Sequence, residues 1–194
     1  MIPPSISENR DQWATCQELD NTLYITIGKG TQISAPLNSY TLTLIGSSTG
    51  TFTLILAQVD GSGASSQQTV FFNIPVGPKG TAAINGTTVG PLQLDSNGDG
   101  VIDATLSPGG LSPSVAVQLL TGILKAFDLP QGTKTSLLAK LEAASSALQR
   151  GERQAASGQL GAFQNEVSAQ SGKNIQTEIA VGLIEIARTI ITSL

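Results

Sequence analysis

The first half of the chain alternates apolar and polar residues with a period of two. Leu42 and Leu44 alternate with threonines, and Phe52 and Leu54 alternate with Thr51 and Thr53. Successive side chains of a strand point to opposite faces, so this alternation predicts half-buried strands. The predicted strands are residues 23–27, 40–44, 52–56, 69–74, 81–84, 87–89 and 92–94. Six or seven short strands separated by Gly and Ser turns indicate an antiparallel β-sandwich.

Turn residues between these strands predict how they connect. Residues 46–50 (Gly-Ser-Ser-Thr-Gly) are predicted to close a hairpin, and residues 60–66 read as the tip of another. Asn85-Gly86 is the strongest signal for a two-residue hairpin turn.

The second half changes to the helical period, after Pro108-Gly109-Gly110 ends the strand pattern. Ser112 is predicted to cap the first helix with Pro113 at its first position, and Gly172 to cap the third. The helices are expected at about 112–129, 135–149, 152–169 and 176–194. Buried faces are expected on the first three of them. The inward residues are Val117, Leu120, Leu124 and Phe127 in the first; Leu137, Leu138, Leu141, Ala144 and Leu148 in the second; and Ala156, Leu160, Phe163 and Val167 in the third.

The two patterns together predict an α+β protein with several domains. Residues 1–20 are expected to be a tail or linker and residues 21–107 the β-sandwich. Residues 108–111 are expected to be a linker, and residues 112–194 a bundle of three to four helices.

The last helix is apolar over a wide face. Its main stripe is widened by Ile184 and Ile191, whereas a bundle helix needs an apolar stripe of only about 100°. The stripe comprises Ile179, Leu183, Ile186, Ala187, Ile190 and Leu194. The helix is therefore expected to lie centrally in the bundle, or to share a face with the β-domain, another module or a second copy of the chain in a homo-oligomer.

An acidic nonapeptide, residues 95–103 (Asp-Ser-Asn-Gly-Asp-Gly-Val-Ile-Asp), lies where the two patterns meet. It places oxygen-bearing side chains at alternate positions and a glycine at the sixth, as a calcium loop does. The expected calcium ligands are the side chains of Asp95, Asn97 and Asp99, the carbonyl of Val101, and Asp103 directly or through water. Since the loop lies between the two halves, a bound ion is expected to stabilise their junction.

The flanks of this loop differ from those of a complete EF-hand. The twelfth position, where an EF-hand has a bidentate acid, is Leu106, and the preceding residues read as strand. Ile102 is expected to anchor the loop to a core. The alternative is a polar turn that binds no ion.

Composition argues against an enzyme. The chain has no histidine, which is the commonest general base, and its one cysteine, Cys16, lies in the unpatterned tail and reads as incidental. The tight acidic group of Asp95, Asp99 and Asp103 is already explained by calcium. The helical acids are expected to face solvent; they are Glu142, Glu152, Glu166, Glu178 and Glu185.

Charge and hydropathy limit the partners and the location. The net charge is −4 with no basic cluster, so neither nucleic acid nor an anionic membrane surface is an expected partner. No run of 18 apolar residues is present, so no membrane insertion is expected.

Between Asn21 and Leu94 only three residues are charged, which is typical of secreted bacterial β-domains. Residues 1–4 do not begin a signal peptide, so the chain is expected to be a piece of a longer protein whose other domains are its partners.

A carbohydrate-binding module is the alternative function, because sugar sites need exposed aromatic rings. The candidate rings are Trp13, Tyr24, Tyr40, Phe52, Phe71 and Phe72, most of which fall on inward strand positions.

Several helical segments resemble a known family. Residues 137–144 (LLAKLEAA), 149–151 (QRG), 159–163 (QLGAF) and 167–175 (VSAQSGKNI) together resemble the FIMAH-type helical module, a small C-terminal domain of secreted bacterial hydrolases and surface proteins. The resemblance covers about residues 112–194.

A weaker resemblance covers the β-domain. Residues 40–44 and 50–54, with the acidic loop, are similar to accessory sandwiches of the prepeptidase C-terminal kind with a dockerin-like calcium loop. The two resemblances imply a non-catalytic, calcium-stabilised accessory or interaction module of a secreted or surface bacterial protein, located outside the cell, with no assigned functional residues.

Overall fold

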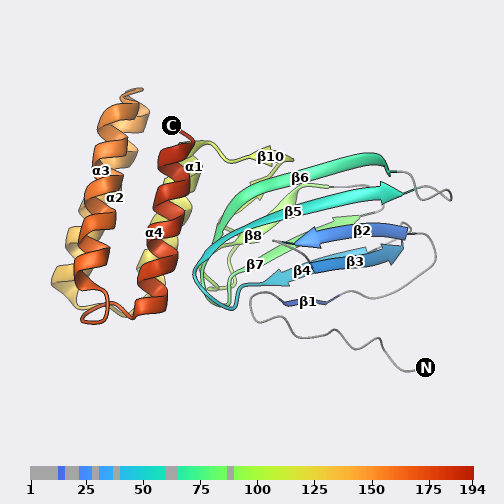
Figure 1. The fold of residues 1–194 in the computed structure, drawn as a ribbon, viewed down its shortest axis with the longest axis horizontal. Helices are drawn as coiled ribbons and strands as arrows, with labels where there is room; N and C mark the ends of the chain where they lie inside the picture. Colours follow the sequence, from blue (N-terminus) through green and yellow to red (C-terminus); the bar gives the residue numbers. More distant parts are fainter. Residues whose placement is uncertain (1–12, 16–21, 28–30, 37–39, 60–64, 87–89) are drawn as a thin grey trace.

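In the part of the chain that the structure describes, two five-stranded sheets pack face to face, and four helices stand beside one end of this sandwich (Figure 1). The structure is a computed structural model that describes residues 13–15, 22–27, 31–36, 40–59, 65–86 and 90–194. Antiparallel sheets followed by four helices confirm the predicted α+β class.

The first sheet has the strand order β1-β4-β7-β8-β9, and the second has the order β10-β6-β5-β2-β3. The described strand pairs are antiparallel apart from β10 and β6, which run parallel. The strand bounds are β1 Trp13–Thr15, β2 Thr22–Ile27, β3 Thr31–Pro36, β4 Tyr40–Ile45, β5 Gly50–Val59, β6 Ser65–Val76, β7 Thr81–Gly86, β8 Leu92–Asp95, β9 Ala104–Leu106 and β10 Gly109–Gly110.

The predicted alternation fills the space between the sheets. Leu42 and Leu44 of β4 are buried from one side, and Leu54 and Leu56 of β5 from the other. Removing apolar side chains of this size from water stabilises a fold by about 1.5–3 kcal/mol each.

Two predicted turns are wrong. Residues 46–50 do not close a hairpin, because β4 pairs with β1 and β7 in the first sheet while β5 pairs with β2 and β6 in the second. They cross from one sheet to the other instead. Asn85 and Gly86 extend β7 and pair with Thr41 and Tyr40 of β4, so they are not a turn; the strand expected at 87–89 lies outside the described residues.

The helices are α1 Pro113–Ala126, α2 Gln131–Gln149, α3 Arg153–Gln170 and α4 Thr177–Thr192. As predicted, the Ser112 side chain accepts a hydrogen bond from the Val115 nitrogen, at 3.3 Å, and Pro113 opens α1. Gly172 follows the end of α3 with φ +71°, the left-handed conformation in which glycine commonly ends a helix. The second helix begins earlier than the predicted residue 135, because Pro130 precedes its first turn and its carbonyl accepts from Lys134.

The wide apolar face of α4 is covered from two sides. Leu183, Ile186, Ala187 and Ile190 are buried in the cluster of the helical bundle, and α4 also packs against β5 of the sandwich. Ile184 and Ile191, which widen the face, are partly buried against the bundle cluster, so the helix lies between the bundle and the β-domain but its extra apolar width faces the bundle (Figure 1). Within the described chain, no helix has the length and apolar character needed to cross a membrane.

The segment between the two halves is more structured than the expected linker at 108–111. Gly109 and Gly110 form β10, which adds to the edge of β6 opposite Phe71 and Phe72. Each half has its own hydrophobic cluster, and the predicted division into separate domains remains a prediction.

Candidate functional site

The acidic loop, residues 95–103, connects the antiparallel strands β8 and β9. Asp95 ends β8, and the backbone nitrogen of Asp103 donates to the carbonyl of Leu94 at 2.8 Å. The predicted site residues therefore lie together in one tight turn, held by a short strand on each side.

Side-chain oxygens of the loop accept hydrogen bonds from its own backbone. The two carboxylate oxygens of Asp95 accept from the nitrogens of Gly98, at 2.7 Å, and Gly100, at 2.8 Å. Asn97 accepts from the nitrogen of Asp99 at 2.9 Å, and Asp99 from that of Val101 at 2.8 Å. These bonds curl the chain so that alternate residues contribute oxygens to the same turn.

Two glycines allow this curl. Gly98 and Gly100 have φ values of +78° and +86°, in the left-handed region that side chains with a Cβ rarely adopt. Gly100 is the sixth residue of the loop, where a calcium loop requires a sharp turn.

Asp103, the last residue of the loop, is hydrogen-bonded to Ser96, the second residue. Its Oδ2 accepts from the backbone nitrogen of Ser96, at 2.8 Å, and from the Ser96 hydroxyl, at 2.6 Å. Ser96 is fully buried and Asp95 is only 3 % exposed, whereas Asp99, Val101 and Asp103 are exposed. The loop therefore has a buried base and an open tip.

The donor set is compatible with calcium, which binds hard oxygen ligands, although the carboxylates do not converge. Among the residues that the structure describes, no three His, Cys, Asp or Glu side chains form a group that could hold a metal ion. Calcium at this site would therefore also need the amide oxygen of Asn97, the carbonyl of Val101 and water. Leu106, the twelfth position, is buried in the sandwich core and supplies no ligand.

The expected anchoring role of Ile102 is wrong. Ile102 is 48 % exposed and Val101 64 % exposed, because both lie at the open tip. The loop is anchored instead by backbone packing at its base. The Ser96 carbonyl accepts from the nitrogen of Gly77 at 2.7 Å, and a Cβ added to Gly98 would lie 2.9 Å from the carbonyl carbon of Lys79.

Three loops thus meet at the end of the sandwich that faces the helices. We call them the junction loops: residues 46–50, 77–80 and 95–103. Gly46 exchanges two backbone hydrogen bonds of 2.8 Å with the second loop, donating to Gly80 and accepting from Lys79. The acidic loop is therefore part of a continuous backbone network.

Helix α1 packs on this network and on the sandwich core. Leu119 is 3 % exposed and belongs to the hydrophobic cluster of the sandwich, although it lies on a helix of the bundle. A Cβ added to Gly77 would lie 3.3 Å from Ile123, and one added to Gly122 would lie 3.8 Å from the Asn97 amide nitrogen. The acidic loop is therefore close to α1.

Helix α4 contacts the first junction loop. The backbone of Gly182 lies so close to Thr49 that any side chain on Gly182 would overlap the Thr49 carbonyl. The Thr49 hydroxyl is buried and, among the described residues, has no hydrogen-bond partner. This contact was missed at the sequence level, where nothing sets Gly182 apart from other helical glycines.

A small polar cluster joins α2 to α3. Lys140 forms an ion pair with Glu166, the Ser136 hydroxyl donates to the same carboxylate at 2.9 Å, and Lys140 donates to Ser136 at 3.1 Å. Spacing alone did not reveal this Ser–Lys pair. Glu166 and Glu185 are half-buried, contrary to the expected solvent exposure, whereas Glu142, Glu152 and Glu178 are exposed.

A second polar pair lies at the corner between α2 and α3. Arg150 donates to Glu152 at 2.8 Å, and this hydrogen bond lowers the pKa of Glu152 and raises that of Arg150. Both side chains are about half-exposed, so the pair is a surface contact that contributes little to stability.

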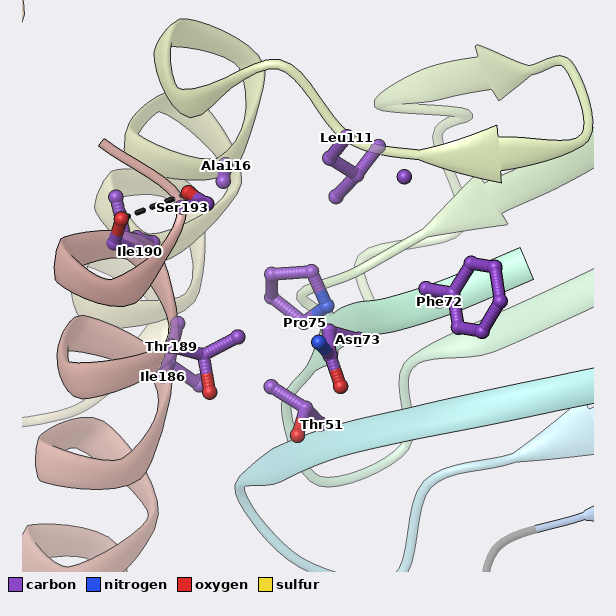
Figure 2. A pocket seen from close by; sticks show the side chains of 11 residues that line it. Thr51, Phe72, Asn73, Pro75, Leu111, Ala116, Ile186, Thr189, Ile190 and Ser193 are labelled. Carbon is purple, nitrogen blue, oxygen red and sulfur yellow. Dashed lines mark hydrogen bonds between the residues drawn. The ribbon is translucent and has the colours of Figure 1, made fainter.

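A cavity of about 80 Å³ lies in the groove between β6 and α4 (Figure 2). Of the candidate aromatic residues, Phe52 and Phe71 are buried in the core, and Phe72 is 49 % exposed on the cavity rim. The side chains of Trp13, Tyr24 and Tyr40 lie outside the described part of the chain.

No protein-family model matches this chain, and neither the curated proteins nor the solved structures include a significant match.

Proposed function

We propose that this chain is a non-catalytic accessory module of a secreted or surface bacterial protein, in which calcium bound to the acidic loop rigidifies the junction between the sandwich and the helices. The observation that carries the proposal is the position of the loop. Its base is hydrogen-bonded to the loop at 77–80 and lies close to α1. Ordering this loop therefore orders the surface on which the helices rest.

The chemistry of the loop supports calcium as the ion. Asp95, Asn97 and Asp99 contribute oxygens at alternate positions, and Gly100 adopts the left-handed turn at the sixth. Asp99 at the tip and Asp103 at the end of the loop are both exposed and open to an ion from solvent. When bound, calcium would balance the negative charge of the carboxylates that contact it.

The size of the expected effect is substantial. An ion present at one hundred times its Kd stabilises the folded state by about 2.7 kcal/mol. That is a large share of the roughly 5–15 kcal/mol that separates folded from unfolded states in typical domains.

The accessory role is supported by the chemistry of the polar clusters. The Ser136–Lys140–Glu166 cluster links two helices, and its ammonium and hydroxyl are both engaged with the same carboxylate. The resemblance of residues 112–194 to the FIMAH-type module supports a location outside the cell, behind other domains of a parent protein.

Calorimetry with and without calcium tests the proposal. We expect millimolar calcium to raise the Tm of the chain, and Asp99→Ala to remove most of that increase while leaving the Tm in chelator nearly unchanged. Asp128→Ala is the matched control, because Asp128 is also exposed but lies between α1 and α2. An equal loss for Asp99→Ala in calcium and in chelator would show that the loop is only a turn.

A further inference from the structure

We propose that the cavity between β6 and α4 binds one neutral sugar ring. We call it the groove cavity; it is lined by Thr51, Phe72, Asn73, Pro75, Gly110, Leu111, Ala116, Ile186, Thr189, Ile190 and Ser193. The proposal goes beyond the calcium-dependent junction and does not depend on it, because none of these residues belongs to the acidic loop.

The groove cavity lies where ligand sites commonly form. Its walls come from the sandwich, the connecting segment and two helices, and small-molecule sites occur preferentially at such interfaces. Figure 2 shows Thr51, Asn73 and Pro75 on the sandwich side, and Thr189 on α4 opposite them. Its volume of about 80 Å³ is smaller than a whole sugar ring, so a ring would lie partly in the cavity and partly at its open rim.

Phe72 supplies an exposed aromatic ring. Its neighbour on β10 is Gly110, and a Cβ added to Gly110 would meet nothing within 4 Å. Because Gly110 has no side chain, the Phe72 ring is left 49 % exposed at the rim. The negative face of such a ring attracts the slightly positive C–H groups on the apolar face of a pyranose.

Asn73 is placed at the rim by an unusual backbone. It has φ +53°, and a register shift between Phe52 and Leu54 interrupts the pairing of β5 with β6 at this point. Bulges of this kind often re-aim side chains next to functional sites. The Asn73 nitrogen donates to Thr53 at 3.3 Å, which leaves its side-chain amide out of this bond.

The polar groups of the groove cavity select a neutral, hydroxyl-bearing ligand. Within the described part of the chain, the Asn73 amide and the hydroxyls of Thr51 and Thr189 have no protein hydrogen-bond partner. A wholly apolar ligand would leave these groups without partners, which is unfavourable. Since no lining residue carries a charge, the site offers nothing to pair with an ionic ligand.

Methyl NMR of the isoleucines on α4 provides a direct test. The full chain would be titrated with the methyl glycosides of glucose, galactose, mannose and N-acetylglucosamine, and with benzene as an apolar probe. We expect at least one sugar to shift the methyl signals of Ile186 and Ile190 saturably, with millimolar affinity. Phe72→Ala should weaken that affinity about tenfold.

Two further variants separate recognition from altered folding. Asn73→Gly removes the amide but tolerates the left-handed backbone, so it should weaken binding without loss of fold. Ile45→Ala, at a residue of similar exposure outside the groove cavity, should leave the affinity unchanged. The proposal is wrong if no sugar gives a saturable shift, if benzene alone does, or if Ile45→Ala weakens binding as much as Phe72→Ala.

Discussion

Gly182 of α4 lies directly against the backbone carbonyl of Thr49, between β4 and β5. The absence of a side chain at residue 182 brings the helix into backbone contact with the sandwich. This contact and the packing of Leu119 are two of the places where the helices join the β-domain.

Gly182→Ala should destabilise the chain. Alanine favours a helix over glycine by about 1 kcal/mol, but its methyl group would overlap the Thr49 carbonyl and force α4 away from β5. Overpacking of this kind costs about 1–3 kcal/mol. We therefore expect a net loss in the free energy of unfolding, measured by urea denaturation.

Gly158→Ala on α3 is the matched control for this substitution. A Cβ at residue 158 meets nothing within 4 Å, so only the gain in helix propensity applies and the variant should be slightly more stable. A gain of similar size for Gly182→Ala would show that α4 does not rest closely on Thr49 in solution.

Thr49→Val should stabilise the chain. The Thr49 hydroxyl is buried and has no partner among the described residues, and a buried polar group without a hydrogen bond costs about 1–3 kcal/mol. Valine has nearly the same shape and removes that cost. We expect the Tm to rise by about 2–4 °C; a fall would mean that the hydroxyl is hydrogen-bonded in solution, for example to water.

The sequence predicts the sandwich and the helices well, because both rest on local periodicity. Leu54 and Leu160 are buried where the period-two and helical patterns expect them. The sequence predicts the connections between the strands poorly. The Gly and Ser residues of 46–50 suit a hairpin and a crossing between sheets equally, and the choice depends on strand pairing far away in the chain.

The turn formed by the acidic loop was predictable from the sequence, but its surroundings were not; its role as a calcium site stays a prediction. Asp95, Asn97 and Asp99 form one turn because their spacing is local. Ile102 was expected to be buried on its apolarity alone, yet no core lies beside the loop tip. The packing of Leu119 against the sandwich could have been predicted, since Leu119 adjoins Leu120 and gives α1 a second apolar side.

Leu119→Ala should destabilise the sandwich and the helices together. Leu119 belongs to α1 but is buried in the sandwich cluster, and truncating a buried leucine costs about 2–5 kcal/mol. Calorimetry should show one transition that moves to lower temperature as a whole. Val181→Ala, at a residue 60 % exposed on α4, should change the Tm little. Two separate transitions, only one of them shifted, would contradict the expected coupling.

Asp103→Ala should destabilise the chain whether or not calcium is present. Its carboxylate accepts from both the nitrogen and the hydroxyl of Ser96, and Ser96 is fully buried. Removing the acceptor leaves two buried donors without a partner, at a cost of about 1–3 kcal/mol for such a group. The loss should therefore persist in chelator, where Asp99→Ala is expected to have almost no effect. If Asp103→Ala were harmless in chelator, the bonds to Ser96 would not hold the loop closed without an ion, and calcium rather than Asp103 would have to order the base of the loop.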